Sequence, residues 1–195
     1  MWVDSATGRL QEVAYVESPH RGARPKGAEP ELIVIHGISL PEGIFGNDHV
    51  LQLFTNRLDT RNDERFTHLA GLRVSAHLYI HRDGHITQFV PFTQRAWHAG
   101  HSSFAGRSEC NDFSIGIELE GTDQSHYADI QYQCLEAVIP ALRDAYPGIA
   151  EDRVVGHCHI APGRKSDPGP LFDWGRLQRT LGIRQPVTQP QRFNK

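Results

Sequence analysis

The sequence lacks the features that mark membrane and secreted proteins. It has no apolar run near the roughly 20 residues that a membrane-spanning helix needs. Its first residues, MWVDSATGRLQEV, do not contain the apolar core of a signal peptide. Cysteine is scarce, and Cys110, Cys134 and Cys158 form no CxxC pair, which favours reduced thiols over a disulfide scaffold. We therefore expect a cytoplasmic protein that does not bind a membrane.

Concentrated positive charge is also absent. The formal net charge is -3, and residues of both signs are interspersed without a basic run or an aromatic and basic stripe. Nucleic-acid-binding surfaces depend on a concentration of Lys and Arg, so we expect no nucleic-acid partner. At 195 residues the chain is long enough for one domain with a buried core, and a second full domain is not expected. We predict a domain over residues 1–182 and a polar, disordered tail over residues 183–195.

One loop is rich in groups that bind metals: VVGHCHIAPGRKSDPG, residues 154–169. His157, His159 and Asp167 supply imidazole and carboxylate groups, and Lys165 adds a positive charge. Imidazole and carboxylate are typical zinc ligands, so the loop is a candidate metal site. The chain contains 12 histidines, however, and by itself the loop is equally consistent with an ordinary polar surface loop.

Zinc would need a further ligand, and His36 is the best candidate outside the loop. It follows the apolar run 32–35 and so lies at the end of an expected buried strand. Two histidines and one carboxylate leave a fourth coordination position open, which is the arrangement of catalytic rather than structural zinc sites. The spacing between His36 and His157 does not by itself establish that they are partners.

Hydrophobic periodicity predicts an α/β fold in which a central mixed β-sheet is flanked by helices. The nearly all-apolar segment 31–36 is typical of a strand covered on both faces, and Asp83 with Gly84 is a strong hairpin turn. The expected strands are residues 31–36, 73–80, 86–90, 113–120 and 153–156, and the expected helices are residues 50–58, 128–146 and 172–181. Pro140 falls inside the second helix, where we expect a kink or a break.

The strand expected at residues 113–120 has two faces of different character. Ile115, Ile117 and Leu119 alternate with Ser114, Gly116, Glu118 and Glu120. A glutamate on such a strand must reach solvent or line a cavity, and Gly116 removes a side chain that would fill that cavity. Glu118 is therefore a candidate for a cleft. The alternative is an edge strand whose polar face is simply wet.

Five motifs in collinear order resemble those of one family. They are HGISLPEG from His36, RVSAHLYIHRDG from Arg73, AWHAG from Ala96, CNDFSIGIELEGTD from Cys110 and GHCHIAPGRKSDPG from Gly156. Together they cover about residues 10–182 and resemble the cytosolic 1,6-anhydro-N-acetylmuramyl-L-alanine amidases (AmpD), within the type 2 amidase and peptidoglycan recognition protein superfamily. The resemblance implies one zinc ion per chain and hydrolysis of an anhydro-muropeptide during peptidoglycan recycling.

The resemblance also implies roles for particular residues. The metal ligands of the family fall on His36, His157 and Asp167, with the carboxylate in place of the Cys of related phage and animal enzymes. Its catalytic glutamate falls on Glu118, which would shuttle a proton, and its catalytic lysine on Lys165, which would stabilise the oxyanion. Glu120 is the local alternative to Glu118. We interpret Arg73, Trp97 and His98 as substrate contacts, although plain core packing is an alternative for Trp97.

Three positions depart from the family pattern. Gly37 stands where Asn follows the first ligand, His159 replaces an Asp two residues after the second, and Glu109 stands where some members carry an Arg near the acidic end of the peptide. In an extended segment Cys158 would face away from the metal and His159 towards it. We nevertheless expect His159 to turn outward or to bind nearby backbone, because a fourth protein ligand would close the site.

Two other functions compete with this one. A muropeptide-binding protein of the same fold would have the cleft without turnover, but such proteins usually lack a metal ligand, and here all three are present. An amidase acting on intact peptidoglycan would need export, for which no signal is visible. We expect the protein to act as a monomer.

Overall fold

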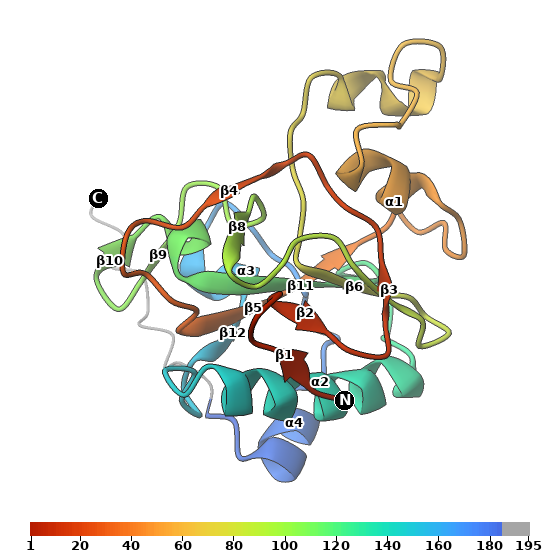
Figure 1. The fold of residues 1–195 in the computed structure, drawn as a ribbon. Coiled ribbons are helices and arrows are strands. Elements are labelled where there is room, and N and C mark those ends of the chain that lie inside the picture. Colours follow the sequence, from red (N-terminus) through yellow and green to blue (C-terminus); the bar gives the residue numbers. More distant parts are fainter. Residues whose placement is uncertain (185–195) are drawn as a thin grey trace, which may run out of the picture.

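A six-stranded mixed β-sheet forms the centre of the protein (Figure 1). The computed structural model describes residues 1–184. The strands of the central sheet are β3 (Ala14–Tyr15), β5 (Leu32–Ile38), β6 (Leu78–Ile80), β7 (Ile86–Gln88), β11 (Ser114–Glu120) and β12 (Val154–Gly156). They lie in the order β12, β5, β11, β6, β7, β3. With helices packed against this sheet, the predicted α/β class is confirmed.

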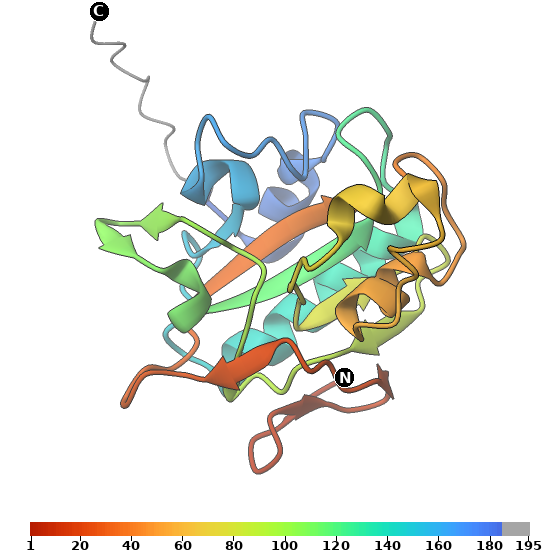
Figure 2. The ribbon, with the colours of Figure 1, turned by 90° about the horizontal axis from the view of Figure 1, so that it is seen from above.

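Strands β12, β5 and β11 run parallel to one another, and Figure 2 shows β5 and β11 side by side. Every residue of β11 and β12 is buried, as expected for parallel strands that are covered on both faces. β11 lies between β5 and β6, so the alternative of a wet edge strand is wrong. β5 also continues to Ile38 instead of ending at His36, because it keeps pairing with β11 to the end.

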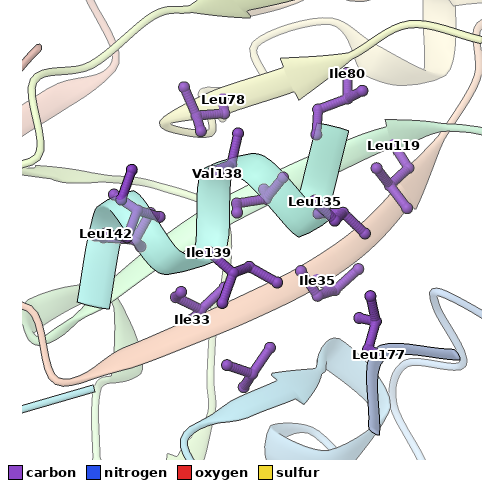
Figure 3. Packing of buried hydrophobic residues seen from close by; sticks show 14 of the residues in the cluster. Ile33, Ile35, Leu78, Ile80, Leu119, Leu135, Val138, Ile139, Leu142 and Leu177 are labelled. Carbon is purple, nitrogen blue, oxygen red and sulfur yellow. The ribbon is translucent and has the colours of Figure 1, made fainter. Parts of the chain in front are cut away.

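Helices α2 (Asp129–Ala145) and α4 (Trp174–Leu181) cover one face of the sheet (Figure 1). Figure 3 shows that the apolar side chains of α2 lie against the isoleucines of β5 and neighbouring apolar residues. These side chains of α2 are Leu135, Val138, Ile139 and Leu142. Pro140 does not break the helix, contrary to the stronger form of the prediction. A proline inside a helix costs about 3 kcal/mol, and the burial of the apolar residues around it, at roughly 1.5–3 kcal/mol each, offsets that cost.

The other segments surround this sheet, and β1 (Val3–Asp4) among them packs against α2. They are β1 (Val3–Asp4), β2 (Arg9–Leu10), β4 (Arg21–Ala23), α1 (His49–Phe54), the 3-10 helix η1 (Glu64–Leu69), β8 (Gln94–Ala96), β9 (Ser103–Phe104), β10 (Arg107–Ser108), the 3-10 helix η2 (Cys110–Asp112) and α3 (His157–Ile160). The predicted hairpin is confirmed, since β6 pairs antiparallel with β7. Its strands are shorter than expected, and so is α1, where Asn56 leaves the helical region with a φ of 57°.

The C-terminal helix α4 ends at Leu181 as predicted, and Gly182 caps it with a φ of 65°. Ile183, which the sequence placed in the tail, is only 1% exposed and belongs to the core. The backbone N–H of Arg184 donates to the Glu151 carbonyl at 2.9 Å. The rest of the predicted tail, residues 185–195, lies outside the described residues. Within residues 1–184 all three cysteines are free, and every helix is too short or too polar to span a bilayer.

Candidate metal centre and active site

The carboxyl-terminal ends of three adjacent parallel strands bring the candidate site together. Glu118 of β11 is paired in register with His36 of β5, and Gly156 of β12 with Ile35, so His157 comes next to His36. The two histidines are 121 positions apart in the sequence. Ligand sites of parallel sheets lie at this edge because the strand ends converge there.

His36, His157 and Asp167 form a compact group of metal-binding atoms. The Nδ1 atoms of the two histidines lie 3.0 Å apart, and each is 3.1 Å from Oδ2 of Asp167. Ligand atoms that surround a tetrahedral zinc at its usual bond lengths are about 3.4 Å from one another. The spacing and the chemistry of the donors therefore both fit zinc.

Burial and hydrogen bonds together favour the protonation states that a metal needs. Burial lowers the pKa of His36 to about 4, so that this imidazole is neutral at pH 7. Burial alone would raise the pKa of Asp167, but its hydrogen bonds with His157 and His36 outweigh this and hold the pKa well below its usual range. A neutral imidazole and an ionised carboxylate are the forms that bind a metal.

His159 and Cys158 lie in the short helix α3 and not in the extended segment that the sequence suggested. Residues two apart in a helix point about 200° apart, so the expectation that His159 shares a face with His157 is wrong. Nδ1 of His159 accepts a hydrogen bond from the Gly156 N–H at 2.9 Å, and its ring packs against Trp174. His159 thus binds nearby backbone as expected, although for a different geometric reason.

Glu118 and Glu120 point to the same side of β11 but have different partners. Both oxygens of Glu120 accept backbone hydrogen bonds, from the N–H of Gly46 at 2.6 Å and that of Arg82 at 3.0 Å. Glu118 is 9% exposed, and its buried Oε2 has no hydrogen-bond partner among the described residues. Burial first, and then the charge of Asp167, raise the pKa of Glu118 well above its ordinary value. A buried carboxylate with a free oxygen and a raised pKa is typical of a proton shuttle.

A cleft of about 570 Å³ opens beside the cluster. Its lining includes Asp167, the exposed Lys165 and residues of the segment 37–42, and also Arg65 and His68. The positive charge of Lys165 acts on Glu118, where it opposes the rise in pKa. The cleft is of the size that binds small ligands and is bordered by basic side chains.

Comparison with known proteins identifies the family. The model of the N-acetylmuramoyl-L-alanine amidase family matches residues 26–170. The chain belongs to this amidase family. The 1,6-anhydro-N-acetylmuramyl-L-alanine amidase AmpD of Citrobacter freundii is 56% identical over 171 residues, covering 88% of this chain and 91% of that protein.

Solved structures of the family are similar as well. A crystal structure of a selenomethionine AmpD derivative has a TM-score of 0.88 at 54% identity and covers 92% of this chain and 99% of that chain. The Escherichia coli amidase AmiD, in complex with anhydro-N-acetylmuramic acid-L-Ala-D-γ-Glu-L-Lys, has a TM-score of 0.57 at 32% identity and covers 82% of this chain and 61% of that chain. The resemblance found in the sequence is confirmed.

In this amidase the three expected substrate contacts lie in different surroundings, and none is among the described residues that line the cleft. Arg73 is exposed. The ring of Trp97 is half-buried and stacks on His20 with a centroid distance of 5.9 Å. The ring of His98 lies behind the metal cluster, where its Nδ1 is 2.9 Å from Nε2 of His36.

The position of His98 corrects the interpretation of Gly116. A Cβ at residue 116 would overlap the His98 ring, so the glycine does not open a cavity towards the substrate. It makes room for an imidazole that supports a candidate ligand. The roles of Arg73, Trp97 and His98 as substrate contacts stay predictions.

Sequence reasoning missed Tyr127, whose hydroxyl donates to the carbonyl of Pro168 at 2.9 Å and so holds the loop that carries Asp167. A Cβ at residue 37 would collide with this hydroxyl, and one at Gly121 would collide with the ring. In this chain, Gly37 therefore leaves the space that the Tyr127 hydroxyl occupies. Gly37 and Gly121 were the only hint in the sequence that a large side chain packs here. Only the fold shows that this side chain is Tyr127.

Proposed function

We propose that this amidase hydrolyses the amide bond between the lactyl group of 1,6-anhydro-N-acetylmuramic acid and L-alanine in muropeptides released during peptidoglycan recycling. The observation that carries the proposal is the meeting of His36, His157 and Asp167 with Glu118 at the ends of neighbouring strands, where Oε2 of Glu118 has no hydrogen-bond partner among residues 1–184. The AmpD relative named for this reaction covers most of the chain. The substrate in the AmiD complex contains the same sugar and the same bond.

His36, His157 and Asp167 would hold one zinc ion through two nitrogens and one oxygen, a donor set that leaves a coordination position open. The ion would supply a Lewis acid that polarises the substrate carbonyl and lowers the pKa of a water molecule towards 7. The neutral state of His36 and the ionised state of Asp167 keep these donors ready at neutral pH.

Glu118 moves the proton. Oε2 of Glu118 takes a proton from the attacking water as the oxygen of that water bonds to the carbonyl carbon. Glu118 then delivers the proton to the alanine nitrogen as the C–N bond breaks. The products are a lactyl carboxylate on the sugar and a free amino group on the peptide. The burial that raises the pKa of Glu118 brings it towards the working pH, which suits a group that both accepts and donates.

Lys165 would stabilise the negative charge that develops on the carbonyl oxygen. It lines the cleft next to Asp167, and its charge reaches Glu118. Loss of one such donor typically costs about 2.7–4 kcal/mol of transition-state stabilisation. Activity in the cytoplasm and a monomeric state are further parts of the proposal.

The proposal can be tested with two substrates and a chelator. Purified protein is incubated with anhydro-muropeptide and, separately, with intact peptidoglycan sacculi, and peptide release is followed by mass. We expect release from the anhydro-muropeptide, its loss with chelator and its return with zinc. Release that is indifferent to chelator would contradict the metal mechanism, and faster release from sacculi would favour the amidase of intact peptidoglycan. Tight binding without release would identify a muropeptide-binding protein.

A further inference from the structure

The outward-facing nitrogens of both candidate ligand histidines contact the same short segment, residues 98–99. Nε2 of His36 lies 2.9 Å from Nδ1 of His98, and Nε2 of His157 lies 3.1 Å from the carbonyl oxygen of Ala99. Both Nδ1 atoms face Asp167 on the other side of the rings. The position of this segment therefore sets the orientation of both imidazoles.

A metal at the Nδ1 atoms would set the direction of the hydrogen bonds that join the two ligand histidines to this segment. If Nδ1 of each ligand faces the metal, its Nε2 carries the proton and donates it outward. His36 then donates to Nδ1 of His98, and Nε2 of His98 donates to the Ser114 hydroxyl, 3.2 Å away. His157 donates to the Ala99 carbonyl in the same way.

One side chain fixes the segment from behind. Oδ1 of Asn111 accepts hydrogen bonds from two successive backbone amides, that of His98 at 3.1 Å and that of Ala99 at 2.9 Å. Asn111 lies in η2 and is itself anchored, because Arg24 donates to its carbonyl oxygen at 3.2 Å. Arg164 also donates to the Ala99 carbonyl, at 2.7 Å, but its side chain comes from the exposed loop.

We propose that Asn111 is a positioning residue of the metal centre, which orients both histidine ligands by holding the backbone of residues 98–99. Hydrogen-bond partners of ligating histidines fix the tautomer and the ring direction, and their loss typically weakens metal binding by about 10- to 100-fold. Asn111 does not contact the ligand histidines itself, but the backbone segment that it holds contacts both of their rings. The inference rests on the proposed zinc site and not on the hydrolytic reaction.

The test compares the zinc affinities of Asn111→Ala and Asn111→Asp, measured without substrate by competition with a chromophoric chelator. Asn111→Ala removes the acceptor, and we expect its zinc affinity to fall about 10- to 100-fold. Asn111→Asp keeps an oxygen in the same place, and we expect it to stay within about threefold of the wild type, since the two amides retain their acceptor. Asn62→Ala, at an exposed asparagine that is not in the lining of the cleft, is the control and should bind like the wild type.

Two outcomes would overturn the inference. One is a folded Asn111→Ala protein that binds zinc as tightly as the wild type. The other is an equal loss in Asn111→Asp, which would mean that the acceptor oxygen is not what matters. Urea unfolding of the metal-free proteins separates the roles, because a purely structural residue would lower stability without changing the zinc affinity of the folded fraction.

If Asn111→Ala does not fold, His98→Phe tests the same connection. It keeps the backbone N–H that Asn111 holds and removes only the imidazole that His36 contacts. Zinc affinity should fall at least tenfold, and an unchanged affinity would overturn the inference. A wild-type protein that binds no zinc would overturn the inference and the proposed mechanism together, whereas zinc binding without hydrolysis would overturn the proposed function alone.

Discussion

Strands β5 and β11 present two faces that are stabilised in different ways. On one face the isoleucines of both strands pack against α2, and any apolar side chain of suitable volume would serve (Figure 3). On the other face His36 and Glu118 stand side by side, surrounded by partners from segments far away in the sequence. The first face provides stability and the second provides chemistry, so substitutions on the two should affect different measurements.

The largest effect is expected from Glu118→Ala on the site face. Positioned acid and base catalysis is worth roughly 10²- to 10⁴-fold, so turnover should fall by that factor while zinc content, measured by elemental analysis, stays near one equivalent. Glu120→Ala is the control on the same strand. Its two oxygens bind the backbone of Gly46 and Arg82, so it should lose stability more than turnover. Near-normal turnover in Glu118→Ala with collapse in Glu120→Ala would reverse the assignment.

The mirror experiment is Ile117→Ala on the packed face. Ile117 is fully buried in the main core cluster, and truncation of such a side chain typically costs about 2–5 kcal/mol. Urea unfolding should show this loss, while the zinc affinity of the folded protein should not change. A loss of zinc binding without a loss of stability would show that the two faces are not separate.

The packed face could be predicted from the sequence, and the site face only in part. The apolar residues Ile115, Ile117 and Leu119 alternate with polar ones, and the apolar residues of α2 recur at helical spacing. Both patterns lie within one segment of the chain, so they can be recognised in the sequence. The meeting of His36 with His157 depends on the register of β12 with β5, which no local pattern encodes. The family resemblance supplied that pairing.

The sequence-based expectations were wrong where the surroundings of a residue depend on parts of the chain that local patterns do not reveal. Gly116 was interpreted as an opening for substrate, but it accommodates the ring of His98. His159 was placed on an extended segment, whereas the chain turns into α3 at once after β12. No sequence pattern indicated the proposed role of Asn111, because that role depends on the backbone amides of residues 98 and 99, which only the fold brings near its side chain.

The pH dependence of stability should also differ between the faces, because only the site face carries a buried carboxyl. The pKa of Glu118 is raised in the folded protein, so the folded state keeps its proton while the unfolded chain ionises above about 4.5. This group therefore lowers stability as pH rises from there to its folded pKa, by up to about 1.4 kcal/mol per pH unit. In urea unfolding, the stability of metal-free Glu118→Gln relative to the wild type should increase as the pH rises above about 4.5, until the folded pKa of Glu118 is reached. A constant difference would show that the carboxyl is ionised throughout.

A smaller effect is expected at Gly37, which follows His36 near the end of β5. A Cβ there would collide with the Tyr127 hydroxyl and disturb its hydrogen bond to Pro168. We expect Gly37→Ala to cost about 1–3 kcal/mol of stability, as overpacking does. In a Tyr127→Phe background the obstructing oxygen is gone and the cost should shrink. Additive costs in this double-mutant cycle would contradict the steric explanation.

The smallest effect is expected from His159→Asp, which tests where the site face ends. His159 adjoins His157 in sequence, yet its Nδ1 is occupied by the Gly156 N–H and its ring by Trp174. An aspartate at the third residue of a short helix can accept the same kind of backbone hydrogen bond. Zinc content should therefore be unchanged and turnover within about tenfold of the wild type, because the residue supports backbone and not the metal. A gain of several orders of magnitude would mean that His159 obstructs the site, and the muropeptide-binding alternative would then describe the natural protein better than the hydrolase.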